Sequence, residues 1–311
     1  MRTLVVMAHY DASGQVADHV LYQLDAWNEV AERVLLVSTA DLTDPLVVEQ
    51  VEKRAELVRR PNYGYDFFSY KTGLDAAGDL TRYDLVVICN DSYVGPLVPF
   101  SKILSTMAAR PLDFWGLTYS ARRGLHVQSF FVAFTPWVVR SQTFQTFWRT
   151  MTPVSDRFEV IKRYELGMSS TLRKAGFCDG GYFEEAAADR RLARLRHFWW
   201  AAHTVRRLPQ PRRDAWLRLP AEPWNPAACL ADKALEGARL PVVKIDTLRY
   251  DPYGLGSERL LTRCEQRYPE AFAGVREYLR RTSELYPARP GENDGPTVPP
   301  LPVRRAIGYA R

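Results

Sequence analysis

The chain has 311 residues, of which 46% are hydrophobic and 25% are charged, a composition typical of a globular protein and unlike that of a disordered chain. No run approaches the ~20 consecutive apolar residues that a membrane-spanning helix needs. The 42 Lys and Arg residues exceed the 36 Asp and Glu residues, and this excess suits an anionic partner, such as nucleotide phosphates, a membrane surface or nucleic acid.

The N-terminal residues indicate a buried strand rather than a targeting signal. Residues 4–10, LVVMAHY, are nearly all apolar, as in a strand that is covered on both faces. The stretch is shorter than the apolar region of a signal peptide and lacks a small-residue cleavage site. We therefore expect a cytoplasmic protein whose four scattered cysteines stay reduced.

Strands and helices then alternate along the chain. Apolar residues recur at helical spacing over residues 14–30, and residues 33–40 and 83–90 are further apolar runs of strand length. Helices are expected at residues 47–57 and from about Asp66. Two further strands and two further helices are expected, at residues 113–118, 126–134, 141–151 and 164–175. This order predicts an α/β domain with a mostly parallel central sheet.

A change in composition after residue 185 marks the end of this domain, which we place at residues 1–185. Residues 186–286 are expected to form a smaller, mainly helical region that completes the fold. Its elements are a helix, a strand and a second helix at residues 227–235, 240–248 and 257–281. Its first part, residues 190–218, contains nine arginines and one acidic residue. The tail, residues 287–311, is rich in Pro and Gly and is expected to be mobile.

Residues 59–74, RRPNYGYDFFSYKTGL, combine a turn with the start of a helix. Asn62 and Gly64 are turn residues, and Asp66 and Lys71 follow on the expected helix. A helix N-terminus with free backbone N–H groups suits an anionic ligand. A capped turn with Lys71 in solvent accounts for the same residues equally well.

The strand at residues 83–90 ends in the sequence NDS. Open α/β sheets bind ligands at the carboxyl ends of their strands, and a carboxylate there can hold Mg²⁺ or Mn²⁺, which would neutralise a diphosphate. Asp91 is therefore a candidate metal ligand, and Asn90 can assist through its carbonyl. The alternative is a simple turn, which the following Gly95-Pro96 closes.

Three further polar residues lie near predicted elements. Glu165 is expected in the first turn of the helix at residues 164–175, where the helix dipole favours an acidic residue in any case. His126 and Gln128 precede an apolar strand and lie on one of its faces by alternation. A lone histidine is more often structural than catalytic, so His126 and Gln128 are secondary candidates for contact with a metal or a phosphate.

Taken together, these segments resemble the rhamnan synthesis protein F family. The matching pieces are NYGYDFFSYKTGL, NDS followed by GPL, DFWGLT, HVQSFFVAF, and WNPAACL with LPVVKIDTLRYDP, and they occur in that order between Asn62 and Pro252. Proteins of this family are associated with rhamnose-containing cell-surface polysaccharides and are regarded as glycosyltransferases. The resemblance implies a nucleotide-sugar donor, dTDP-rhamnose, and a lipid-linked or polymeric glycan acceptor.

A more remote likeness is to family 2 glycosyltransferases with the GT-A fold. Their first strand ends in a turn with a tyrosine and polar residues, to which His9, Tyr10 and Asp11 are similar. They carry an Asn-x-Gly element before the strand that binds the metal, and Asn62 and Gly64 match it here. The likeness implies that these residues bind the nucleotide-sugar.

The same likeness assigns roles to the two acidic candidates. The metal motif Asp-x-Asp of these enzymes is matched by NDS around Asp91, so one carboxylate is missing here. Their catalytic base is an acid eleven residues before a glycine that ends a helix, and Glu165 stands eleven residues before Gly176. Glu165 would then take the proton of the acceptor hydroxyl, while Asp91 with a metal, helped by Lys71 or Arg59, would steady the diphosphate during a single inverting displacement.

The same residues are compatible with other functions. The same chemistry with another sugar donor is one, and a non-catalytic scaffold of a polysaccharide assembly complex, favoured by the missing carboxylate, is another. The arginine-rich segment also suits nucleic acid, but a complete α/β domain already has a ligand edge, so we expect no nucleic-acid partner.

The arginine-rich segment is also a candidate for peripheral contact with an anionic membrane at the inner face of the plasma membrane. The residues concerned are Arg190, Arg191, Arg194, Arg196, Phe198, Trp199 and Trp200. Arginines attract anionic headgroups, and aromatic rings are enriched at the membrane interface. A helix that packs its aromatic residues into the core explains the segment equally well.

Overall fold

The computed structural model describes residues 1–207, 221–287 and 301–306. Its centre is a seven-stranded sheet in the order β10-β6-β9-β4-β1-β2-β3. These strands are β1 Thr3–His9, β2 Arg33–Ser38, β3 Glu56–Arg59, β4 Leu85–Asn90, β6 Phe114–Gly116, β9 Phe131–Phe134 and β10 Asp179–Gly181. Within this sheet β9 runs antiparallel to its neighbours and the other pairings are parallel. The predicted α/β class with a mostly parallel sheet is confirmed.

Strand β1 is buried on both faces because its side chains alternate between two hydrophobic cores. Val5 and Met7 belong to one core, with residues of helix α1 (Asp18–Asn28) and helix α4 (Phe100–Ala108). Leu4 and Val6 belong to the other core, which also contains residues of α3 (Tyr65–Ala77), α5 (Pro136–Arg140) and α6 (Gln142–Arg149). The uninterrupted apolar sequence of β1 is thus required by the helices on both faces.

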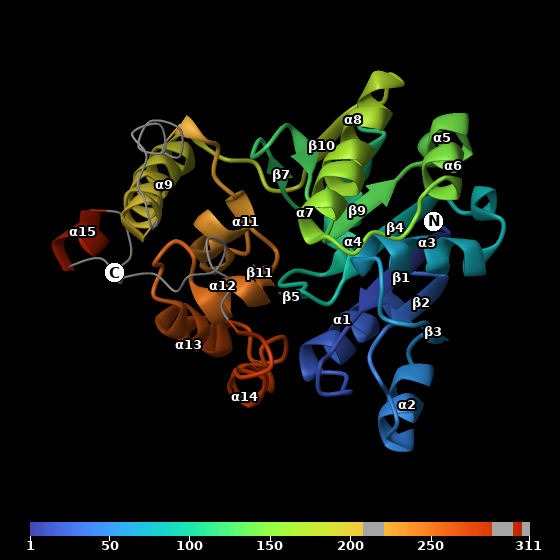
Figure 1. Cartoon of the computed structure of the whole chain (residues 1–311), viewed down its shortest axis with the longest axis horizontal. Coiled ribbons are helices and arrows are strands. Elements are labelled where there is room, and N and C mark those ends of the chain that lie inside the picture. The colour runs from blue at the N-terminus through green and yellow to red at the C-terminus, as the bar shows by residue number, and fades with distance from the viewer. Residues whose placement is uncertain (208–220, 288–300, 307–311) are drawn as a thin grey trace.

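The C-terminal region is mainly helical, as expected, and lies beside the sheet (Figure 1). Its helical segments are α9 Ala187–Arg207, α11 Pro226–Cys229, η3 Ala231–Leu235, α12 Ile245–Tyr250, α13 Ser257–Arg267 and α14 Val275–Arg281. Its buried residues, such as Leu240 and Phe272, share the hydrophobic core of α1 and α4. Packing across residue 186 is therefore continuous. The domain boundary at this residue stays a prediction.

A two-stranded pairing joins this region to the sheet. Strand β11 (Val243–Lys244) pairs antiparallel with β5 (Tyr93–Val94), which directly follows β4. In Figure 1 the two strands lie at the junction between the sheet and the C-terminal helices. The prediction of one strand over residues 240–248 is therefore wrong except at β11, because residues 240–242 are not in a strand and helix α12 begins at Ile245.

Other boundaries also differ from the sequence expectation. The strand expected at residues 126–134 is two short strands, β8 (His126–Val127) and β9, because β8 pairs with β7 (Tyr119–Ser120) in a separate small sheet. The helix expected at residues 257–281 is interrupted between α13 and α14, at Pro269 and Gly274. Helix α2 (Pro45–Glu52) ends before residue 57, and β3 follows it.

Parts of two sequence predictions lie outside the described residues. They are residues 208–218 of the arginine-rich segment and most of the tail after residue 287, in which α15 (Leu301–Ala306) is described as a helix. Within the described parts of the chain, no helix is both long enough and apolar enough to cross a membrane.

Candidate functional site

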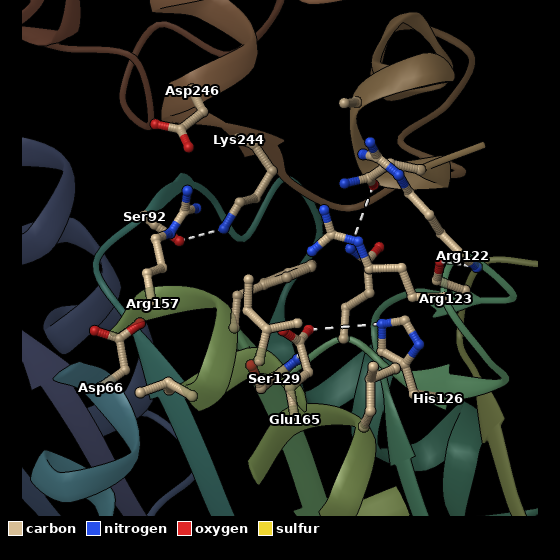
Figure 2. Close-up of a pocket in the computed structure, with 18 of the residues that line it drawn as sticks. Asp66, Ser92, Arg122, Arg123, His126, Ser129, Arg157, Glu165, Lys244 and Asp246 are labelled. Atoms are coloured by element: carbon tan, nitrogen blue, oxygen red, sulfur yellow. Dashed lines mark hydrogen bonds and ion pairs between the residues drawn. The ribbon is translucent and has the colours of Figure 1, made fainter. Parts of the chain in front are cut away.

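A cavity of about 510 Å³ lies where the carboxyl end of β4 meets the C-terminal region. Four cationic side chains and three carboxylates line it: Arg122, Arg123, Arg157, Lys244, Asp66, Glu165 and Asp246. Figure 2 shows Lys244 pointing into the cavity from the C-terminal region, and Asp66 and Glu165 facing it from the side of the sheet. A cavity with this mixture of charges can bind a phosphorylated ligand and still hold a proton acceptor.

The structure brings together five residues that the sequence singled out from separate segments. Asp66, Asn90, His126, Gln128 and Glu165 all line this one cavity. They come from the start of α3, the end of β4, the β8 segment and the helical run that leads into α8 (Gly167–Lys174). The expectation that strand ends and helix starts meet at the carboxyl edge of the sheet accounts for this convergence.

A directed chain of hydrogen bonds fixes the end of β4. The side-chain amide of Asn90 donates to Asp66 Oδ2 at 2.7 Å. Asn90 Oδ1 accepts from the Ser92 hydroxyl at 2.6 Å and from the Ser92 backbone N–H at 3.1 Å. The Ser92 hydroxyl in turn accepts a hydrogen bond from the ammonium group of Lys244. The chain thus runs from a cation to a carboxylate with every donor pointing the same way, an arrangement in which neighbouring hydrogen bonds strengthen one another.

Lys244 is held by backbone pairing as well as by its side chain. It pairs with Tyr93 in the β11–β5 ladder, and the next backbone N–H, of Ile245, donates to Ser92 O at 2.9 Å. Its ammonium nitrogen lies 4.3 Å from the centroid of the Phe130 ring, a cation–π distance. Burial lowers the pKa of Lys244, and the carboxylates around it, Asp246 first among them, oppose that shift.

Glu165 lies inside a longer helical run and not in a first turn. The run begins at α7 (Arg157–Val160), where the Asp156 side chain accepts from the Glu159 backbone N–H at 2.8 Å, and continues through the π-helical turn Ile161–Leu166. The prediction of a helix start at residue 164 is therefore wrong, because Asp156 is the N-cap. Wide π-helical turns are frequent at functional sites, and this one contains Glu165.

The predicted end of that helix at Gly176 is confirmed. Gly176 has a φ of 92°, and its N–H donates to Arg173 O at 2.9 Å while Phe177 N–H donates to Leu172 O at 3.2 Å. These two bonds form a Schellman motif, in which the left-handed residue is usually glycine.

One hydrogen bond orients the carboxylate of Glu165. Its Oε1 accepts from the Ser129 backbone N–H at 3.1 Å, and the Ser129 carbonyl is fixed by the hydroxyl of the buried Tyr70 at 2.9 Å. His126 Nε2 lies 3.7 Å from the same Oε1. Because His126 Nδ1 is 2.8 Å from Gly124 O, and a carbonyl can only accept, Nδ1 carries a proton and Nε2 faces the carboxylate.

Asp91, the predicted metal ligand, is not among the residues that line the cavity. Its Oδ2 accepts from the Tyr10 backbone N–H at 2.8 Å. Burial, reinforced by the negative charges of Asp66 and Asp11, raises the pKa of Asp91 to about 8 even though the Tyr10 N–H favours the charged form. Asp91 is thus held against the turn that follows β1 and does not face the cavity.

These neighbours do not fit a divalent cation at the end of β4. Asn90 is hydrogen-bonded to Asp66 and to Ser92, and Ser92 is hydrogen-bonded to Lys244. The ammonium of Lys244 places a positive charge beside the position where a cation would bind. Among the described residues, no group of three or more His, Cys, Asp or Glu side chains is arranged to hold a metal ion.

The residues predicted at the end of β1 have partners of their own. His9 is buried, with its Nδ1 3.0 Å from Ser38 Oγ, and burial lowers the pKa of His9 to about 4. Asp11 is also buried and accepts from the hydroxyl and backbone N–H of Ser13. Tyr10 is 43% exposed, so its ring is the part of this turn that an external ligand can reach.

Three other predicted residues, which lie on or just before α3, do not line the cavity. Asn62 is exposed. Gly64 precedes the helix with a φ of 73°, and a Cβ there would lie 2.7 Å from Phe68 Cβ, so a larger residue is excluded. Lys71 pairs with Asp75 one turn further on, at 2.9 Å. The lysine that faces the cavity is Lys244 rather than Lys71.

None of the four cationic side chains that line the cavity was predicted from the sequence. Lys244 and Asp246 belong to a stretch that was expected to be an ordinary strand, although two charged residues in the otherwise apolar LPVVKIDTL were a usable signal. Arg122 and Arg123 lie in the loop between β7 and β8. The guanidinium group of Arg122 lies 5.3 Å from the centroid of the Trp200 ring, which ties this loop to α9.

The fold and the cavity define an α/β protein with a charged ligand site at the carboxyl edge of its sheet. The family model described as rhamnan synthesis protein F matches residues 34–209, more than half of the chain, and the chain belongs to this family. The matched residues include Asp66, Asn90 and Glu165 of the cavity, whereas Lys244 lies after them.

Individual relatives match over shorter stretches. The chain is 25% identical over 126 residues to an uncharacterized protein, y4gN, of Sinorhizobium fredii, a match that covers 39% of this chain and 33% of that protein. It is 28% identical over 116 residues to the virulence protein VirA of Vibrio anguillarum, with 36% of each chain covered. The matches thus span about a third of the length of these curated relatives.

Solved structures overlap with the chain only in part. HddC from Yersinia pseudotuberculosis has a TM-score of 0.31 and 10% identity, over 50% of this chain and 89% of that one. Glucosyl-3-phosphoglycerate synthase from Mycobacterium tuberculosis, solved with Mn²⁺, UDP and phosphoglyceric acid, has a TM-score of 0.34 and 13% identity, over 53% and 66% of the two chains.

Proposed function

We propose that the chain is a GT-A-like glycosyltransferase that moves a sugar from a nucleotide-sugar donor to a glycan acceptor with inversion. One observation carries this proposal: the Glu165 carboxylate faces a group of cations across one cavity, at the edge of the sheet where ligands bind. Membership in the rhamnan synthesis protein F family supports dTDP-rhamnose as the donor and a lipid-linked or polymeric glycan as the acceptor.

In the proposed reaction, the acceptor hydroxyl attacks the anomeric carbon of the donor while Glu165 takes its proton. The bond between that carbon and the phosphate oxygen breaks, and its electron pair leaves with the nucleoside diphosphate. A single displacement inverts the anomeric carbon, so a β-linked rhamnosyl donor would yield an α-rhamnoside. The Ser129 N–H holds Glu165 Oε1 in position at 3.1 Å, and cationic side chains offset the charge on the leaving group.

A panel of nucleotide-sugars tests the donor part of this proposal. We expect one nucleotide-sugar, dTDP-rhamnose first, to raise the melting temperature of the protein, because a ligand that binds the folded state stabilises it. Differential scanning fluorimetry with matched sugar phosphates as controls is the measurement. A non-catalytic scaffold would show no shift with any member of the panel.

We also propose a peripheral contact between α9 and an anionic membrane, since a lipid-linked acceptor would bring the cavity close to the bilayer. Arg191 and Arg194 are exposed on this helix, as are Leu195 (53%) and Phe198 (63%), and their spacing places them on one face. The prediction that Arg196 takes part in this contact is wrong, because Arg196 is fully buried and pairs with Asp232 at 2.7 Å. Trp199 and Trp200 are half-buried.

Liposome flotation tests this contact. Wild-type protein is expected to float with anionic vesicles at low salt, and neutralising Arg191 and Arg194 together should reduce the floating fraction, since each arginine near the surface contributes about 1 kcal/mol. Neutralising Arg276 and Arg280, which lie on the C-terminal helices and pair with nearby glutamates, is the matched control. Equal flotation of all three proteins would exclude α9 as the membrane contact.

A further inference from the structure

The side chains at the end of β4 are already engaged with one another. Asp91 accepts from the Tyr10 backbone, and Asn90 bridges Asp66 and Ser92. The Ser92 hydroxyl also accepts a hydrogen bond from the Lys244 ammonium. A lysine therefore supplies the positive charge at the strand end where the sequence led us to expect a metal ion.

We propose that Lys244 is the principal cation that binds the diphosphate of the donor in this cavity, so that binding requires no divalent metal. This inference rests on the proposed function and adds to it the chemistry of the leaving-group site. Arg122, Arg123 and Arg157 line the same cavity and supply further positive charge around the phosphates.

The geometry of Lys244 suits this role. An ammonium group has three N–H donors. One is directed at Ser92, and the face of the Phe130 ring lies on another side at 4.3 Å. The group borders the cavity, so its remaining N–H donors are available to a bound anion. An ion pair that forms in such a partly buried place is stronger than one in open water.

The position of Lys244 is also fixed before a ligand arrives. The β11–β5 pairing sets its backbone, and the hydrogen-bond chain through Ser92 and Asn90 to Asp66 holds its side chain. A preformed cation costs little reorganisation when negative charge develops on the leaving diphosphate. The carboxylates of Asp66 and Asp246, which lie in the same cavity, help to keep the ammonium protonated.

A divalent cation and this ammonium would compete for one place. Like charges a few ångströms apart repel, most strongly where water is scarce. Metal binding beside Ser92 would therefore require Lys244 to leave its partners or lose its proton. The diphosphate gains its neutralising charge from the protein itself, and chelation of metal ions should have no effect on binding.

Calorimetric titration of the full chain with dTDP and with UDP, in excess EDTA and in excess MgCl₂, tests this assignment. Wild-type protein is expected to bind the preferred nucleotide equally well in both buffers. Lys244→Met should weaken that binding by about 10- to 100-fold, which corresponds to the loss of one charge-assisted hydrogen bond. Lys53→Met, which removes an exposed lysine paired with Glu49 on α2, is the matched control and should bind as the wild type does.

Two further variants cover the case in which Lys244→Met fails to fold. Lys244→Arg keeps the charge and should retain metal-independent binding with a smaller loss, and Ser92→Ala frees the ammonium without removing it. Binding by wild-type protein that disappears in EDTA, or a Lys244→Met variant that folds and binds normally, would overturn the assignment of Lys244 alone. Binding of neither nucleotide by wild-type protein in either buffer would overturn the proposed donor site, and the assignment of Lys244 with it.

Discussion

Replacing Glu165 by Gln is expected to reduce sugar transfer by about 10²- to 10⁴-fold while donor affinity changes little, because loss of a general base acts on the chemical step. Glutamine keeps the carbonyl oxygen that accepts from the Ser129 backbone N–H, so the local fold should persist. The turnover number from initial rates and the donor dissociation constant from calorimetry together check this expectation.

Glu159→Gln is the matched control for this variant. Glu159 stands on the same helical run but is partly exposed and pairs with Arg163 at 2.8 Å, and it does not line the cavity. We expect wild-type turnover from it. Parallel losses of donor affinity and of turnover in Glu165→Gln would show instead that Glu165 binds the donor and is not the base.

Replacing Arg196 by Met should destabilise the protein by about 3 kcal/mol, near the lower end of the range for breaking a buried ion pair. Arg196 is fully buried on α9 and forms two hydrogen bonds to the Asp232 carboxylate and one to Cys229 O, all at 2.7 Å. The variant leaves Asp232 without its partner, but the 25% exposure of that side chain lets water offset part of the loss. The free energy of unfolding from urea titration is the measurement.

The neighbouring exposed arginine provides the comparison. Arg194→Met should change the free energy of unfolding by less than about 0.5 kcal/mol, as surface substitutions usually do. The double variant in which Asp232 is also replaced by Leu should recover part of the lost stability, since the uncompensated carboxylate is gone. Equal stability of the Arg196 and Arg194 variants would mean that the buried pair does not secure α9.

The sheet could be predicted largely from the sequence because its central strands are buried on both faces. In β1 and β4 nearly every residue is apolar, a pattern that few other elements produce. The two strands of this sheet that were not predicted are its edge strands, which have other compositions. β3 is the four-residue sequence ELVR, with two apolar residues between charged ends, and β10 is the short, glycine-rich sequence DGG.

In the candidate site, too, some residues could be predicted from the sequence and others could not. Asp66 and Asn90 were predicted because each stands close to the start or end of an element, and the topology of the sheet gathers such positions at one edge. Glu165 was predicted from its spacing of eleven residues to Gly176, although it lies inside a helical run. Lys244 reaches that edge by pairing with a strand about 150 residues earlier in the chain, and no local pattern encodes such a pairing. For Arg196, the helical spacing gave no sign of burial, because its partner Asp232 lies outside that helix.

Release of nucleoside diphosphate from nucleotide-sugars, compared between wild-type protein and Glu165→Gln, tests the proposed transfer most directly. Water can replace the glycan acceptor slowly in such an assay, so the natural acceptor need not be known. We expect the wild-type protein to release the nucleoside diphosphate from one donor, with or without EDTA, and the variant to bind that donor without releasing it. No release from any donor, or equal release by the two proteins, would contradict a glycosyltransferase in which Glu165 is the base.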